Sequence, residues 1–345
     1  MKKRKFSLFK LIIKLIIWVL TFAVLAPVGL GLIVYYAREV EPQKLTVTTE
    51  KIAISELPQE FDGMKIVQIS DLHGKKFLGN KLTETINGLK PDILVITGDV
   101  LDGQFTDYRY IHQVLEPMKA KLGKFSVYGN NEYSSKLSRK EMDAAYKKAG
   151  VTVLPNGNYR VSYQGKHIWL VGVEDPNTDH DRLDIALKGT DDAPKILLAH
   201  SPEIINKASD RKIDFVLSGH THGGQITVPG LAQHPELKDK VNLFLVKANI
   251  ILNRFLSYLG RYKDTLSKLH LWNDRLSHYS SRSVKLPRTE LIYSFNMKPG
   301  FEKYNTGFYK VGNTTMYVNR GLGETRISLR LFSPPEISVF TLSRN

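Results

Sequence analysis

Hydrophobic and polar residues follow three patterns along this chain. The first is an apolar run of 22 residues, from Leu15 to Tyr36, that contains no charged side chain. Short apolar runs come next and predict buried strands at 64–70, 92–98, 124–129, 166–173, 195–200 and 214–220. Amphipathic stretches at 80–90, 108–120 and 138–149 follow the first three runs and predict helices. This order predicts an α/β domain behind an N-terminal apolar helix.

The N-terminal run is long enough to cross a membrane. Its length gives about 33 Å as a helix, against a hydrocarbon core of about 30 Å. A cleaved signal peptide is the alternative, but its apolar region is typically only about 7–15 residues long. Basic residues precede the run, at Lys2, Lys3, Arg4, Lys5, Lys10 and Lys14. The length of the run therefore predicts an uncleaved, single-pass anchor, for which a bacterial cell membrane is the expected setting. The positive-inside rule predicts a cytoplasmic N-terminus and an extracytoplasmic domain after Arg38.

The amino-acid composition limits which partners and which kinds of site the protein can have. With 42% hydrophobic and 24% charged residues among 345, the chain has the composition of a folded protein. A formal net charge of +15 indicates an anionic neighbour, such as lipid headgroups, a wall polymer or nucleic acid. Because the chain has no cysteine, disulfides, thiolate zinc sites and cysteine nucleophiles are excluded. Any metal must bind His, Asp, Glu or Asn.

Residues that can bind metals cluster where the predicted strands end. The clusters are Asp71-Leu72-His73, Gly98-Asp99-Val100-Leu101-Asp102, Gly129-Asn130-Asn131-Glu132, His200 and Gly219-His220-Thr221-His222-Gly223-Gly224. Ligands of open α/β sheets gather beyond the carboxyl ends of strands, so these clusters can converge on one site. A single such motif is more often a cap or a surface feature. Together, four imidazoles, two carboxylates and an amide suit one or two divalent metals such as Mn, Fe, Co or Zn.

The motifs DxH, GDxxD, GNNE, a lone histidine and GHxH resemble the pattern of the calcineurin-like metallophosphoesterases, in which the third motif is GNH[DE]. The resemblance is close from Met64 to Pro229, and the segment from Met316 to Leu342 resembles the closing strands of a membrane-anchored bacterial branch. It implies an α/β (α+β) fold in which helices flank a two-layer β-sandwich, with two metals about 3.5–4 Å apart. By resemblance, Asp71, His73, Asp99 and His222 would hold one metal, and Asp99, Asn130, His200 and His220 the other. A metal-bridging hydroxide would then attack phosphorus.

Asn131 departs from the family pattern, which has a histidine at this position. An amide cannot donate a proton near neutral pH, so general acid catalysis is the step that the substitution puts in question. Asn131 could still bind phosphate through its NH₂ group, His180 could supply the proton, or the chain could be a non-catalytic pseudoenzyme. Because all the implied metal ligands are present, we expect a working enzyme.

The segment 233–302 looks longer than the corresponding connection in the family. Basic residues follow a heptad spacing along it, at Lys240, Lys247, Arg254, Arg261, Lys268, Arg275 and Arg282. With apolar residues on the other faces, this predicts helices that lie in a membrane interface. A helical cap over the domain is the alternative. The expected organisation is a basic stub and anchor at 1–37, a linker and first strand at 38–63, a core at 64–232, this helical insert at 233–302, and closing strands at 303–345.

The sequence therefore predicts a membrane-tethered phosphohydrolase with two divalent metals. Its expected substrate is a phosphomonoester or pyrophosphate at the outer membrane face, on a phosphorylated small molecule or a lipid-linked one, and the resemblance includes enzymes that cleave nucleotide-linked acylated sugars. Membrane lipid is the other expected partner. Two alternatives remain: a metal-binding interaction protein without turnover, from Asn131, and a nuclease or phosphodiesterase, from the net charge. We expect no nucleic acid partner.

Overall fold

The chain contains an N-terminal apolar helix and a separate folded unit. The computed structural model describes residues 2–75, 79–103, 107–227, 240–241, 244–245, 247–251, 303–325 and 328–344. Two compact units are present, and α1 (Lys2–Tyr35) belongs to the first and both β-sheets to the second. Among the described residues, one helical stretch, Phe9–Gln43, is long and apolar enough to cross a membrane, with a mean hydropathy of 2.5. The predicted apolar helix is therefore present, with Pro27 inside it.

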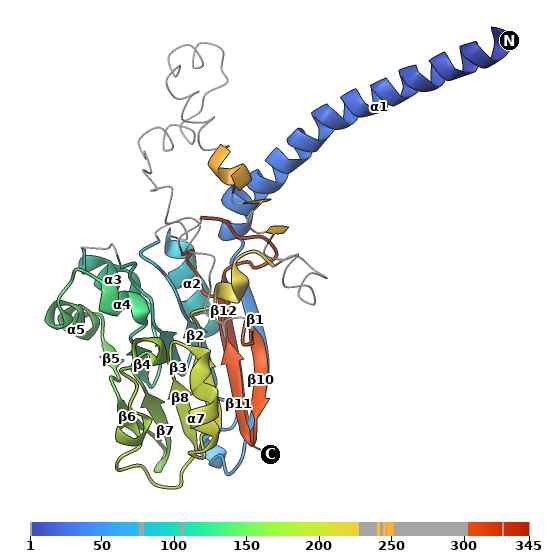
Figure 1. The fold of residues 1–345 in the computed structure, drawn as a ribbon. Helices are drawn as coiled ribbons and strands as arrows, with labels where there is room; N and C mark the ends of the chain where they lie inside the picture. Colours follow the sequence, from blue (N-terminus) through green and yellow to red (C-terminus); the bar gives the residue numbers. More distant parts are fainter. Residues whose placement is uncertain are drawn as a thin grey trace. The chain divides into compact units, whose positions relative to one another are not determined.

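Two six-stranded sheets form the second unit (Figure 1). The first has the order β1 (Thr46–Ile54), β12 (Glu336–Arg344), β2 (Lys65–Ile69), β3 (Ile93–Thr97), β4 (Gly123–Val127) and β5 (Val151–Val153). The second has the order β10 (Gly307–Val311), β11 (Thr314–Val318), β9 (Phe215–Ser218), β8 (Lys195–Leu198), β7 (Lys166–Gly172) and β6 (Gly157–Tyr163). Strands β2, β3 and β4 are parallel to one another, as are β7, β8 and β9.

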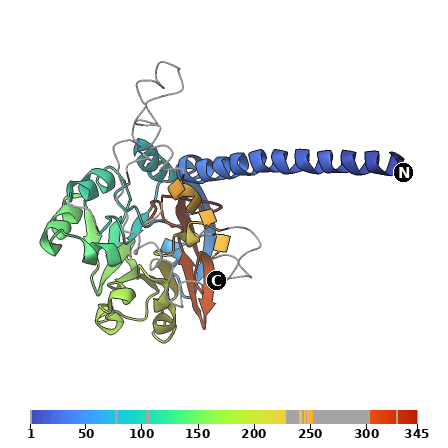
Figure 2. The same ribbon diagram turned by 45° about the horizontal axis from the view of Figure 1, so that its top comes forward.

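The central strands are buried on both faces, which explains their unbroken apolar runs. In β3, Ile93 and Val95 pack into the core between the two sheets, whereas Leu94 and Ile96 pack toward the helices. The outer face of the first sheet is covered by α2 (Gly79–Leu89), α3 (Arg109–Leu115) and α5 (Arg139–Lys148). The second sheet is covered by α6 (Leu183–Ala186) and α7 (Ile205–Ser209) (Figure 2). The predicted two-layer β-sandwich flanked by helices is confirmed.

All six predicted strands and all three predicted helices occur close to their expected bounds. Helix α3 ends at Leu115 rather than at residue 120, because Pro117 cannot continue it. The edge strand β6 was not predicted, since its sequence GNYRVSY mixes polar residues through a short run. Most of the predicted insert lies outside the described residues, including Arg254, Arg261, Lys268, Arg275 and Arg282, and only Lys240 and Lys247 of the basic stripe lie within them. The insert and the domain boundaries stay predictions.

Candidate metal centre

The loops that follow five parallel strands converge at one edge of the sandwich. Loops after β2, β3 and β4 carry Asp71, Asp99 and Asn130, and loops after β8 and β9 carry His200 and His220. Hydrogen bonds tie these loops together, for example from the Asp71 N–H to the Gly98 carbonyl and from the His220 N–H to the Asp71 carboxylate, both at 3.0 Å. Parallel strands place their carboxyl ends at a common edge, so the topology itself assembles the site.

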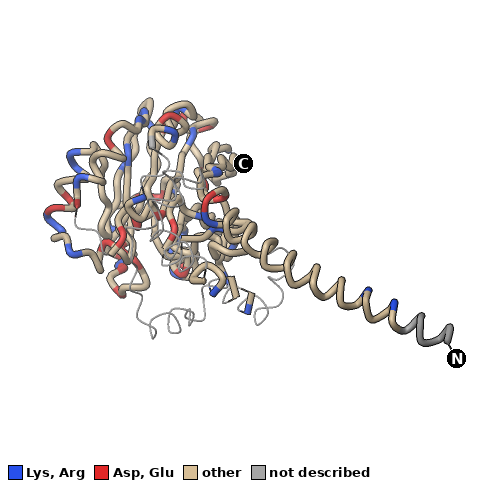
Figure 3. Tube along the Cα trace, turned by 90° about the horizontal axis from the view of Figure 1, so that it is seen from above, with Lys and Arg blue, Asp and Glu red and all other residues tan. Residues whose placement is uncertain are grey.

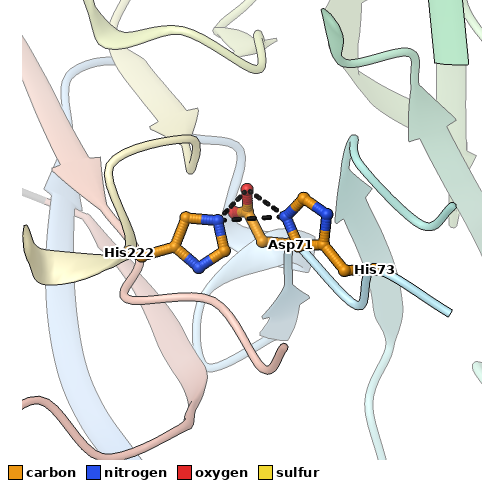
Figure 4. A group of neighbouring side chains, drawn as sticks. All are labelled: Asp71, His73 and His222. Atoms are coloured by element: carbon orange, nitrogen blue, oxygen red, sulfur yellow. Dashed lines mark hydrogen bonds and ion pairs between the residues drawn. The ribbon is translucent and has the colours of Figure 1, made fainter. Parts of the chain in front are cut away.

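Asp71, His73 and His222 form a first cluster of side chains whose ligand atoms face one another (Figure 4). The Nε2 atoms of the two histidines are 3.0 Å apart, and Asp71 Oδ1 lies 3.3 Å from that of His222 and 3.8 Å from that of His73. All three residues are buried. Two ring nitrogens and a carboxylate oxygen so close together form a donor set that suits a divalent cation.

Asp99, His200 and His220 form a second cluster. His200 Nε2 lies 3.3 Å from Asp99 Oδ2 and 3.0 Å from His220 Nδ1. The same Asp99 oxygen is 3.7 Å from His73 Nε2 in the first cluster. Asp99 therefore faces histidines of both clusters, which is the arrangement that a bridging carboxylate requires.

Two buried oxygen atoms in this region have no hydrogen-bond partner among the described residues. They are Oδ1 of Asp71 and Oδ1 of Asn130, the amide that the motif resemblance assigns to the second cluster. An unsatisfied buried acceptor costs about 1–3 kcal/mol, so such atoms call for a partner. Divalent cations would satisfy both, and the residues present therefore fit the divalent metals that the motif resemblance implies.

Backbone carbonyls orient two of the histidine rings. His200 Nδ1 lies 2.8 Å from the Thr97 carbonyl oxygen, and His222 Nδ1 lies 3.1 Å from that of Gly323. A carbonyl can only accept, so Nδ1 of each ring carries a proton, and when the ring is neutral its Nε2 has a lone pair directed at its cluster. The polypeptide thus selects the tautomer that can bind a metal.

The backbone is strained at five of the six residues of the two clusters. Positive φ angles occur at Asp71 (53°), His73 (49°), Asp99 (52°), His220 (73°) and His222 (54°). Each such residue costs on the order of 1–3 kcal/mol and persists only where surrounding contacts enforce it. Gly129 allows one such contact, because a Cβ atom at this position would lie 2.2 Å from Asp99 Oδ1. The concentration of strain in the candidate ligands supports a functional role for this edge.

The protonation equilibria of the histidines differ within each cluster. Burial lowers the pKa of His220 and of His222 to about 3, so both rings are neutral. Burial also acts to lower the pKa of His73 and of His200, but Asp71 and Asp99 outweigh it and raise both pKa values. Without a cation, these two rings keep the protons that offset the carboxylate charge up to a higher pH than an ordinary histidine does. A bound cation would take over that role and release the protons.

Glu132 organises the loop that carries Asp99. Its carboxylate is buried and accepts hydrogen bonds from the backbone N–H groups of Asp99 (2.9 Å), Val100 (2.7 Å), Leu101 (3.2 Å) and Gly129 (2.8 Å). The sequence shows Glu132 only as part of a motif, and its position beside Asn130 and Asn131 is the one signal for this role.

The segment after β7 contributes residues that the sequence analysis did not assign to the site. Asn177 Nδ2 lies 2.9 Å from His220 Nε2. His180, the predicted alternative proton donor, is exposed, and its ring stacks on Tyr133 with centroids 4.9 Å apart and planes 10° from parallel. Tyr133 belongs to α4 (Asn130–Ser134), so the segment lies against the helix that carries Asn131. A role for His180 in proton transfer stays a prediction.

The calcineurin-like phosphoesterase family model matches residues 64–224. An uncharacterized metallophosphoesterase of Bacillus subtilis, YkuE, is 32% identical over 323 residues, which cover 89% of this chain and 88% of YkuE. The chain belongs to the calcineurin-like metallophosphoesterase family. It is therefore a phosphoesterase hydrolase, and its clusters are metal-ligand groups of a family that uses divalent ions.

Some relatives are named as transmembrane proteins, which concerns the predicted N-terminal membrane anchor. A transmembrane protein with a metallophosphoesterase domain from Bos taurus is 35% identical over 205 residues, which cover 53% of this chain and 46% of that protein. The chain thus spans about half the length of this relative. Together with α1, such relatives indicate a membrane-anchored branch of the metallophosphoesterases. Among solved structures, the phosphopantetheinyl hydrolase of Mycobacterium tuberculosis aligns at 16% identity and a TM-score of 0.32, over 46% of this chain and 83% of that one.

Proposed function

We propose that this metallophosphoesterase is a dinuclear phosphohydrolase that works at the outer face of a bacterial membrane. The main support for two cations is the position of Asp99 between the two clusters. Its Oδ2 lies 3.3 Å from His200 Nε2 and 3.7 Å from His73 Nε2. Asp71, His73, Asp99 and His222 would hold one cation, and Asp99, Asn130, His200 and His220 the other. Bound there, the cations would supply Lewis-acid charge to a phosphoryl group and acidify a water molecule.

The protein's own groups have separate tasks in this proposal. The buried histidines and carboxylates would fix the positions of the cations, and so the positive charge that binds the phosphate. Asn131 offers an NH₂ group beside Asp99 but no acid. The proposed substrate is therefore one whose leaving group departs without protonation, such as a pyrophosphate or an activated phosphomonoester. The α1 anchor favours a substrate in or near the membrane. Such a substrate would be a phosphate group of a lipid-linked or nucleotide-linked acylated sugar.

The nuclease alternative loses support from the distribution of charge. Residues 64–232 contain 22 Lys and Arg against 20 Asp and Glu, whereas residues 1–38 contain 7 basic residues and no acidic ones, and 233–302 contain 12 basic and 6 acidic. Basic and acidic residues are interspersed over the described part of the sandwich (Figure 3). A basic track for nucleic acid is expected to concentrate positive charge near the site. Here the excess comes mainly from the anchor and the insert.

A substrate screen tests the proposal. The full chain in detergent, stripped of metal and reloaded with Mn, Fe, Co or Zn, is given an aryl phosphomonoester, an aryl phosphodiester, a pyrophosphate and single-stranded DNA. We expect turnover of the monoester or the pyrophosphate, and its loss in Asp99→Asn but not in Asp184→Asn, which alters an exposed carboxylate paired with Arg211. No turnover with any metal would favour the interaction protein, and preference for DNA would favour the nuclease.

A further inference from the structure

A chain of hydrogen-bonding side chains leads away from the second cluster. Asn177, in the short 3-10 helix Pro176–Thr178, has Nδ2 at 2.9 Å from His220 Nε2 and at 2.8 Å from Ser201 Oγ. The Ser201 hydroxyl donates to Asp175, whose side chain is fully buried. None of the family motifs includes Asn177, Ser201 or Asp175. The sequence gives no reason why an asparagine should contact a candidate metal ligand here.

His220 differs from the other candidate histidines in the nitrogen atom that it turns toward its cluster. His73, His200 and His222 all approach their neighbours through Nε2, whereas His220 places Nδ1 at 3.0 Å from His200 Nε2. A ring nitrogen binds a cation only when it carries no proton, so a neutral His220 that ligates through Nδ1 must carry its proton on Nε2. That N–H needs an acceptor, and the Asn177 amide lies within hydrogen-bond distance of Nε2.

The amide of Asn177 can provide this acceptor. Its oxygen and nitrogen occupy nearly equivalent positions and exchange by a half-turn about the terminal torsion, so either can face His220. With Oδ1 facing the ring, Asn177 accepts from the His220 Nε2–H, while the Ser201 hydroxyl keeps its single proton for Asp175. With Nδ2 facing the ring, the amide would instead donate to Nε2, which would leave the proton on Nδ1 and block the cation.

Contacts outside the metal centre hold Asn177 in place. Asn156 clamps the segment on both sides of Asn177, because its Oδ1 accepts from the backbone N–H groups of Glu174 (3.2 Å) and Arg182 (2.8 Å). Its Nδ2 donates to the Glu174 carboxylate and to the His180 carbonyl, both at 2.9 Å. These contacts hold the backbone of the segment that carries Asn177 without using a candidate metal ligand.

We propose that Asn177 is a positioning residue that accepts a hydrogen bond from His220 Nε2–H and so fixes the tautomer in which Nδ1 binds the second cation. The inference rests on the proposed dinuclear centre. Partners that orient a ligating histidine typically change metal affinity by about 10–100-fold when they are removed. Asn177 would therefore control how firmly the second cation is held, although it touches neither the cation nor the substrate.

Three substitutions test whether Asn177 acts by accepting a hydrogen bond, rather than by donating one or by packing alone. Asn177→Asp keeps the size and can only accept, Asn177→Leu removes hydrogen bonding, and Asn158→Leu is a matched control, because Asn158 donates to the Ala186 and Lys188 carbonyls away from the clusters. Metal content and affinity are measured on the full chain after dialysis against a chelator of known strength. We expect two ions in the wild type, Asn177→Asp and Asn158→Leu, and about 10–100-fold weaker binding of one ion in Asn177→Leu.

Other outcomes of these measurements would contradict the inference. If Asn177→Leu binds both ions like the wild type, or if Asn177→Asp is weakened as much as Asn177→Leu, Asn177 does not act as an acceptor. A wild type that binds only one ion contradicts the dinuclear proposal, and the inference then fails if Asn177→Leu leaves that ion's affinity unchanged. Nitrogen NMR of the zinc-loaded wild type decides the tautomer without a variant: a proton on His220 Nε2 supports the inference, and a proton on Nδ1 overturns it.

Discussion

The side chain of Asn131 donates a hydrogen bond to Asp99 Oδ2 over 2.5 Å, and its backbone N–H donates to Oδ1 of the same carboxylate at 2.8 Å. Its own Oδ1 accepts from the Gly103 N–H at 3.3 Å. Asn131, at the position where the motif resemblance implies a histidine, therefore contacts the carboxylate that faces both clusters. Asparagine keeps a neutral donor at this position and removes the ionisable group, so the effect of the replacement should appear in proton transfer more than in metal binding.

Leaving-group dependence is the first prediction. A sugar or lipid alkoxide needs a proton as the P–O bond breaks, whereas an aryl oxide or a phosphate departs largely unaided. We expect the wild type to prefer phosphoanhydrides and aryl esters over alkyl phosphates. Asn131→His should raise the turnover of alkyl phosphates more than that of aryl phosphates, within the range of about 10²–10⁴ that general acid catalysis supplies.

The measurement is kcat/KM against leaving-group pKa for both proteins. A steep dependence in the wild type that flattens in Asn131→His supports this account. A shallow dependence that the substitution leaves unchanged would mean that another group provides the proton, and His180→Ala should then steepen it.

Asp99 is the subject of the second prediction. It lies between His200 and His73, so Asp99→Ala should remove a ligand from both cations and reduce bound metal as well as activity. Asp99→Asn keeps the shape but loses the charge, and we expect it to abolish activity with a smaller loss of metal. Elemental analysis of the purified chain measures the content. Two ions per chain in Asp99→Ala would contradict the bridging role.

The apolar runs predicted the central strands, because these strands are buried on both faces, as β2 and β3 show, whereas the two-layer sandwich was implied only by the motif resemblance. The sequence predicted the candidate ligands because each follows such a strand. The role of Glu132 was not predictable, since its partners are backbone N–H groups that converge only after β3 and β4 pair. Asn177 was missed for a similar reason: its contact with His220 joins segments 43 positions apart and leaves no local pattern.

Glu132→Gln is the third prediction. Glutamine has one acceptor oxygen where the carboxylate has two, so its NH₂ group would face backbone N–H donors that then lose their partner. We expect the free energy of unfolding to fall by about 1–3 kcal/mol, the cost of an unsatisfied buried donor. Urea denaturation of the metal-free chain measures it, with Glu116→Gln as a control at an exposed carboxylate. Equal stability in both variants would mean that Glu132 does not hold the Asp99 loop.

Membrane binding by the predicted insert gives the fourth prediction. Basic residues near an anionic surface contribute about 1 kcal/mol each, so even part of the stripe that includes Lys240 and Lys247 would add to a single anchor. A chain that begins at residue 38 should sediment with anionic vesicles at low salt and leave them at high salt. Equal binding to neutral vesicles, or none to either kind, would favour a helical cap.

The fifth prediction concerns the stability of the metal-free chain as pH changes. The pKa values of His220 and His222 fall from 6.5 to about 3 because both rings are buried. The unfolded chain therefore binds more protons between those values, and stability rises with pH up to about 6.5. The pKa values of His73 and His200 are raised above 6.5, because their carboxylate partners outweigh burial. Their contribution is fully present below 6.5 and is lost as pH rises through the folded-state pKa values.

Metal-free protein should therefore be most stable near the ordinary histidine pKa of 6.5 and become less stable on either side. A bound cation should reverse the loss of stability above pH 6.5. It requires His73 and His200 to be neutral and therefore binds more tightly as their protons leave. Thermal unfolding of both forms between pH 5 and 9 tests this, with the metal-loaded form expected to gain stability where the metal-free form loses it. Parallel pH profiles for the two forms would show that neither histidine exchanges a proton for a metal.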